Sequence, residues 1–219
     1  MANAQMFDIN TSALESLKYA LNATQSQYIG AYNRALTQTV KKLHRDSVKL
    51  MVEQAGVKSK ALAKRRVKDF SSERSGSREG RSLSGLKLRG AKIWYGLNPF
   101  RVSELKGKRS GVTATRDNKK KSGRRAGNVT FIPNGRGLSP TKFHNSFIGK
   151  RYGVRSIWIR GPDGRIREAR IAVAEVIEEG IDDHIFNNIG PVFWNYFEKE
   201  LSARVAANIH FDSRTGKRK

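Results

Sequence analysis

The chain has 219 residues and a formal net charge of +24, from 43 Lys and Arg against 19 Asp and Glu. A hydrophobic share of 37% supports one domain, with room for a small second lobe. The absence of cysteine excludes a disulfide framework and a thiolate metal site. No apolar run approaches the roughly 20 residues of a membrane span, and residues 1–8 lack the features of a secretory signal. We therefore expect a soluble protein that stays inside the cell or in a particle assembled there, with no membrane partner.

The positive charge is concentrated in the middle of the chain. Residues 1–57 have a net charge of +2 and residues 137–219 a net charge of +4. Residues 58–136 hold 23 basic side chains against 5 acidic ones. A localised excess of this size indicates a polyanionic partner, most commonly nucleic acid, and carries no information about the fold.

The N-terminal part has the pattern of one long helix. Ser12 and Glu15 are spaced as a capping box, and apolar residues follow at three- and four-residue steps from Leu14 onward. Gly56 is a suitable residue to end such a helix. Residues 58–70 then predict a second, short and strongly basic helix.

The middle of the chain is polar and poor in apolar residues. Residues 71–85 form a Gly- and Ser-rich linker, and residues 86–97 alternate as a strand does. Residues 103–127 are rich in Gly, Lys and Arg and contain few large apolar side chains. They bury too little surface to offset the entropy of ordering, so we predict a long exposed loop or an extended hairpin.

The C-terminal part predicts strands followed by a helix. The strand candidates are residues 128–133, 143–151, 154–160 and 165–173. Residues 161–164 carry a strong turn signal, whereas residues 174–179 fit either a strand end or a helix start. Near Pro191 an apolar residue begins to recur at every fourth position, which predicts a final helix that packs on the sheet.

These elements predict an α+β fold. It has a long N-terminal helix, a central and mostly antiparallel β-sheet with a long basic loop, and a C-terminal helix packed on the sheet. We divide this one domain into a helical region at residues 1–70, a basic linker, strand and exposed loop at 71–127, the sheet and final helix at 128–211, and a basic tail at 212–219.

The basic segment is the candidate site for duplex DNA. Its side chains could each meet a phosphate, in contacts that are independent of sequence and weaken steeply with salt. These candidates are Lys106, Lys108, Arg109, Arg116, Lys119, Lys120, Lys121, Arg124 and Arg125. No aromatic residue lies between Phe100 and Phe131, so this segment does not offer base stacking. The alternative is a solvated, flexible loop.

Signals of catalysis are scarce. The four histidines are far apart and match no metal-ligand spacing. The cluster Asp182, Asp183 and His184 is better explained as the start of a helix than as a metal site, and no phosphate-binding Gly-rich loop or nucleophile elbow occurs. We expect no enzyme activity, no cofactor and no metal.

The order of elements resembles that of the phage minor tail protein Z family. The similarity is carried by residues 31–43 and 57–67 in the helices, by 143–151 and 156–160 in the strands, and by 192–201 in the last helix. In residues 31–43, the Arg-Ala-Leu sequence at 34–36 matches a family pattern without carrying chemistry. The chain departs from the family at its long basic segment and again at residues 165–168.

The resemblance implies a structural virion protein that completes the tail at its head-proximal end. We expect a homo-oligomeric ring of six copies around the DNA channel, next to the tail terminator and the head–tail connector, assembled in the host cytoplasm. Two alternatives remain open. One is an independent nucleic-acid-binding protein without sequence preference. The other is a nuclease, which needs a carboxylate or histidine cluster for Mg²⁺.

Overall fold

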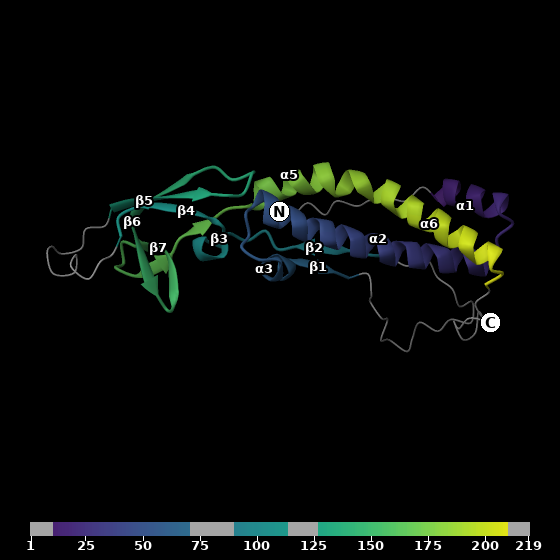
Figure 1. Ribbon diagram of the computed structural model, residues 1–219, viewed down its shortest axis with the longest axis horizontal. Helices are drawn as coiled ribbons and strands as arrows, with labels where there is room; N and C mark the ends of the chain where they lie inside the picture. The colour runs from purple at the N-terminus through teal and green to yellow at the C-terminus, as the bar shows by residue number, and fades with distance from the viewer. Residues whose placement is uncertain (1–10, 71–89, 114–126, 210–219) are drawn as a thin grey trace. The chain divides into compact units, whose positions relative to one another are not determined.

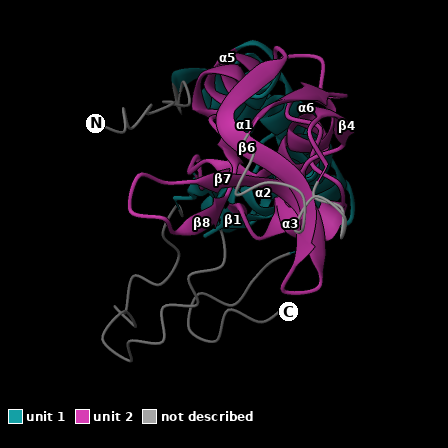
Figure 2. Cartoon of the chain, turned by 90° about the vertical axis from the view of Figure 1, so that its left-hand side faces the viewer, with its two compact units in different colours: residues 1–46, 68–94, 183–219 teal, residues 47–67, 95–182 magenta. Residues whose placement is uncertain are grey.

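The computed structural model describes residues 11–70, 90–113 and 127–209, which fall into two compact units (Figures 1 and 2). The helical unit draws on residues 1–46, 68–94 and 183–219, and the sheet unit on residues 47–67 and 95–182. Both helices and antiparallel sheets are present, so the α+β class predicted from the sequence is confirmed. No described helix is both long enough and apolar enough to cross a membrane.

Three helices build the core of the helical unit: α1 (Thr11–Ala20), the first part of α2 (Gln25–Gln54) and α6 (Ile189–Ala206). The buried residues of this core are Leu14, Ala23, Tyr28, Ile29, Ala31, Ala35, Phe193, Phe197 and Leu201. The Phe197 ring stacks on Phe193 at 5.9 Å between centroids and meets the edge of Tyr28 at 5.7 Å. The final helix therefore packs on the N-terminal helices, which corrects the predicted packing on the sheet.

The predicted single N-terminal helix is two helices. Asn22 has a left-handed backbone (φ 50°), which ends α1. Thr24 then caps α2, because its hydroxyl accepts from the Gln27 N–H at 3.3 Å and its own N–H donates to the Gln27 side chain at 2.9 Å. This reciprocal pair starts the long helix at Gln25, whereas the pattern of apolar residues begins at Leu14.

The end of α2 belongs to the sheet unit and confirms the predicted stop at Gly56. Gly56 has a φ of +65°, and a Cβ there would lie 2.8 Å from the backbone nitrogen of Gly135. The N–H groups of Arg136 and Gly137 donate to carbonyls in the last turn of α2 at 3.1 Å each. The segment after β5 thus satisfies carbonyls that a helix end leaves open.

The second predicted helix is much shorter than expected. Ser59 caps α3 (Lys60–Lys64), and the chain then turns into β1 (Val67–Asp69). This strand pairs with β2 (Ile93–Tyr95) in a two-stranded sheet. Val67 is buried, so pairing and burial of a β-branched residue outweigh the local helical pattern.

The main sheet has five antiparallel strands in sequence order. These are β4 (Gly107–Gly111), β5 (Gly127–Pro133), β6 (Thr141–Arg151), β7 (Val154–Arg160) and β8 (Ile166–Glu168). Strands β5, β6 and β7 confirm the predicted strands 128–133, 143–151 and 154–160. The predicted strand 165–173 is instead divided between β8 and a second short strand that belongs to another sheet. A short pair, β3 (Phe100–Arg101) with β9 (Arg170–Ile171), and the 3₁₀ turn η2 (Val102–Glu104) complete the strand region.

The two described ends of the basic segment 103–127 pair as a hairpin, which was one of the two predicted structures. Strand β4 pairs with β5, from Gly107 opposite Pro133 to Gly111 opposite Val129. Leu105, just before β4, is fully buried.

The segment after residue 173, for which the sequence fitted either a strand end or a helix start, is the helix α5 (Ala174–His184), with Ile177 and Gly180 buried. A Cβ at Gly180 would lie 3.0 Å from Leu50 of α2, so this glycine permits close helix packing. A 3₁₀ turn, η3 (Phe186–Asn188), leads into α6.

Candidate nucleic-acid interface

One face of β4, β5 and β6 carries exposed lysines. Lys108 lies opposite Ile132, Ser110 lies opposite Thr130, and Thr130 lies opposite Lys142. Residues paired across antiparallel strands project from the same face. Lys108 and Lys142 are both exposed, and Ile132 between their strands is 41% exposed. This face therefore presents positive charge to solvent from a rigid sheet.

Arg109 faces the other way. It lies opposite the buried Phe131, with the guanidinium 6.0 Å from that ring and one N–H donating to the Val102 carbonyl at 3.3 Å. Burial lowers the pKa of Arg109 and the charge of Arg155 lowers it further, while Glu168 acts in the opposite direction. Arginine remains charged in proteins despite such shifts, so Arg109 is a half-buried cation held within the sheet unit.

Glu168 is the carboxylate that balances this buried charge. Its Oε1 accepts from the Ser103 N–H at 3.0 Å and from the Ser156 hydroxyl at 2.6 Å. Partial burial lowers the pKa of Lys58, the charge of Arg109 adds to this effect, and Glu168 opposes it. Arg109 and Glu168 are only partly exposed, in contrast to the lysines on the outer face.

The nine predicted phosphate-binding residues separate into three sets. Lys106 and Lys108 are exposed, and the backbone of Lys106 is fixed by its N–H on the Gly56 carbonyl at 2.7 Å. Arg109 is half-buried. Six lie outside the described residues: Arg116, Lys119, Lys120, Lys121, Arg124 and Arg125.

Further cations on the strands were not singled out from the sequence. Those exposed between β5 and β9 are Arg136, Lys142, Lys150, Arg155, Arg165, Arg167 and Arg170. Except for Arg136, their charge was hidden in the modest net charge of residues 137–219, because that interval also contains acidic helices. A count by predicted element, with strands separated from helices, is the signal that would have found them.

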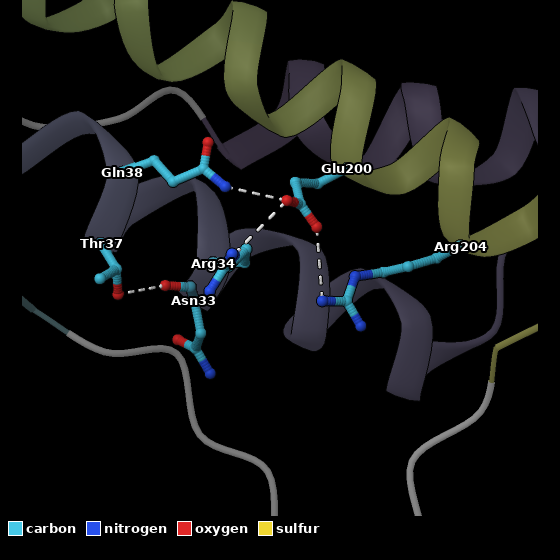
Figure 3. Close-up of polar contacts among 6 residues, drawn as sticks. All are labelled: Asn33, Arg34, Thr37, Gln38, Glu200 and Arg204. Atoms are coloured by element: carbon cyan, nitrogen blue, oxygen red, sulfur yellow. Dashed lines mark hydrogen bonds and ion pairs between the residues drawn. The ribbon is translucent and has the colours of Figure 1, made fainter. Parts of the chain in front are cut away.

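One cluster of paired charges links two helices of the helical unit. Glu200 of α6 accepts from the Gln38 side chain at 3.0 Å and lies 3.6 Å from Arg34 and 3.5 Å from Arg204 (Figure 3). The Thr37 hydroxyl donates back to the Asn33 carbonyl within α2 at 2.8 Å. The contacts of Glu200 with Gln38 and Arg34 join α2 to α6, and Arg204 adds a second positive neighbour within α6.

No constellation for catalysis emerges in the described part of the chain. Within residues 11–70, 90–113 and 127–209, no three His, Asp or Glu side chains come together as metal ligands would. Asp182, Asp183 and His184 are exposed in the last turn of α5, which corrects their expected place at the start of a helix. An open hollow of about 400 Å³ in the helical unit is lined by Gln38, Lys41, His44, Arg45, Asp69 and Tyr196.

The chain gives no match to protein-family models, to curated proteins or to solved structures. The grounds for a functional proposal are thus the surface chemistry described above and the resemblance noted in the sequence.

Proposed function

We propose that the chain is a structural protein of a tailed-phage virion. It completes the tail at the head-proximal end, where six copies form a ring around the DNA channel and join tail to head. Its neighbours are the tail terminator and the head–tail connector, and it carries out no catalysis. The order of helices and strands that resembles the minor tail protein Z family gives the proposal its direction.

The observation that carries the proposal is the exposed positive charge of the sheet region. Residues 95–113 and 127–171 hold 13 Lys and Arg against 3 Asp and Glu. Most of these cations lie on strands, and Lys108 and Lys142 share one outer face. A ring subunit beside passing duplex DNA needs a positive surface that does not read sequence, and phosphate contacts from lysine provide it.

Self-assembly has support from a second charged surface. In the sheet unit, α5 places Glu175, Glu178, Glu179 and Asp182 at helical spacings of three and four residues, and all four are exposed. Each copy thus carries one acidic helix and one basic sheet. Opposite surfaces of this kind suit a head-to-tail contact between copies, which is the contact that closes a ring.

The test is to separate phage heads from tails and to count this chain in each by quantitative mass spectrometry. We expect about six copies per tail and none on heads that have not been joined, as the closed symmetry of the ring requires. Absence of the chain from both particles, with recovery on cellular nucleic acid, would contradict the proposal. That result would favour the alternative, an independent nucleic-acid-binding protein without sequence preference, which the positive surface also fits.

A further inference from the structure

The tip of the β6–β7 hairpin combines an exposed aromatic ring with cations. Tyr152 is 86% exposed and occupies the two-residue turn together with Gly153 (φ 77°). The Arg151 guanidinium lies 5.8 Å from the centroid of the Tyr152 ring and 5.9 Å from that of Trp158. The two rings meet edge to face at 6.1 Å. The tip therefore holds a preformed stack with Tyr152 at its open end.

The base of this stack is rigid. Trp158 is only 5% exposed, and its indole N–H donates to the Gly149 carbonyl at 2.9 Å. Strands β6 and β7 pair without interruption from Ser146 to Arg151. A fixed Trp158 ring against the edge of Tyr152 reduces the entropy that Tyr152 would lose on stacking against a ligand.

Tyr152 adopts an unfavourable backbone for its residue type. Its φ is +50°, in the left-handed region that costs an ordinary side chain roughly 1–2 kcal/mol. The other described non-glycine residues with positive φ are all asparagine, at positions 22, 145 and 208, and asparagine tolerates this region well. A two-residue turn of this kind prefers Asn-Gly. Folding alone therefore does not favour tyrosine here, which points to a role in binding.

Cations lie on both faces of the hairpin beside the turn: Arg151 shares the face of Trp158, whereas Lys150 and Arg155 project from the other face. Lys150 lies directly opposite Arg155, and both are exposed. Among the described residues, neither these two side chains nor Arg151 lies within ion-pair distance of a carboxylate. Exposed positive groups around an aromatic ring are the combination that binds a nucleic-acid strand, with phosphates on the cations and a base on the ring.

We propose that the β6–β7 tip binds nucleic acid at unpaired bases, with Tyr152 stacking on a base and Lys150 and Arg155 contacting the adjacent phosphates. The ligand is a single strand or a single-stranded end of a duplex, because a stacked base inside a duplex offers no free face. This inference deepens the proposed function and rests on it only for the presence of DNA. It adds a site separate from the lysines on the outer face of β4 to β6.

The test uses the full chain and fluorescence anisotropy with two labelled probes, a 20-nucleotide mixed single strand and a 20-base-pair blunt duplex. Tyr152→Ala is expected to weaken single-strand binding about tenfold and to leave duplex binding within about twofold, whereas Tyr152→Phe retains the wild-type affinity. Replacement of both Lys150 and Arg155 by Ala should lower the salt slope for the single strand by about 1.4.

Two further variants separate binding from folding. Tyr152→Asn should lose single-strand affinity like Tyr152→Ala while raising the midpoint of thermal unfolding, since Asn-Gly suits the turn. Tyr19→Ala is the matched control, because Tyr19 of α1 is 71% exposed and lies under the Lys18 ammonium at 5.3 Å. It should bind both probes as the wild type does.

The outcomes distinguish this inference from the proposed function. If Tyr152→Ala and Tyr19→Ala bind the single strand equally well, the stacking site is refuted, and unchanged duplex binding leaves the tail role standing. If the Tyr152 variants bind DNA normally but no longer assemble with other copies, the tip is a protein contact and the inference is wrong. Loss of the chain from tails, with single-strand binding intact, would refute the proposed function alone.

Discussion

Two groups of charged residues, one in each unit, differ in what surrounds them. In the helical unit Glu200 is surrounded by Arg34, Gln38 and Arg204, so its charge joins two helices (Figure 3). In the sheet unit Lys108 and Lys142 extend from the outer face toward solvent. Paired charges fix a structure, while exposed charges of one sign remain available for a partner. Position on an element, more than total charge, determines which of these roles a side chain has.

The first test removes a buried side chain from the core of the helical unit and should lower stability the most. Phe197→Ala removes a fully buried ring between Phe193 and Tyr28, and we expect a loss of about 3–5 kcal/mol in the free energy of unfolding. Chemical denaturation followed by circular dichroism measures this loss. Trp194→Ala, on the same helix but at a 36% exposed position, is the control and should cost much less. An equal loss in both variants would mean that burial in this core does not determine its stability.

The next test removes charge from the sheet unit. Replacing Lys106, Lys108 and Lys142 by Ala should leave the unfolding midpoint nearly unchanged, because all three are exposed. Affinity for random duplex DNA should fall, and the slope of log affinity against log salt should shrink by about 3 if each lysine meets one phosphate. Titrations between low and moderate salt measure the slope.

A control for that experiment removes the same number of charges from the helical unit. Lys41, Lys92 and Lys199 are also exposed, so their replacement by Ala changes the net charge equally. We expect a clearly smaller change in slope. If both triple variants behave alike, DNA association depends on net charge alone and the outer face of β4 to β6 has no special part.

The smallest effect concerns the paired charge. Glu200→Gln keeps the shape of the side chain but removes the charge that faces Arg34 and Arg204. We expect a loss of about 1 kcal/mol in the free energy of unfolding and no change in DNA affinity. Thermal unfolding and the same anisotropy titration measure the two quantities. A change in DNA affinity as large as that of the lysine variants would remove the distinction between the units.

Much of the strand region could be predicted because its signals are local. The segment 154–160 is rich in β-branched residues and ends at a turn sequence, and β7 has those bounds. The break between α1 and α2 was missed because an apolar pattern continues across Asn22, while the cap at Thr24 depends on a hydrogen bond. Likewise, the apolar stripe of α6 shows that one face is buried without showing what covers it.

The candidate site was predicted only in part, for a physical reason. Lys108 and Arg109 are equivalent in a count of charge, but they are neighbours on a strand and so point to opposite faces. That strand is poor in apolar residues and exists because it pairs with β5, which is a contact distant in sequence. The site at Tyr152 was not predicted from the sequence either. Only the backbone conformation shows that this tyrosine occupies a turn position that suits asparagine.

The order in which the chain is synthesised sets when each unit can form. Strands β4 to β8 are complete once residue 168 has left the ribosome, so the sheet can begin to assemble while synthesis continues. Helices α1 and α2 emerge much earlier, but Phe193, Phe197 and Leu201 of α6 complete their core only near the end. Their apolar faces therefore remain uncovered until α6 has been made. The first helices to be made belong to the last core to close, and during that interval a chaperone or a neighbouring chain has access to them.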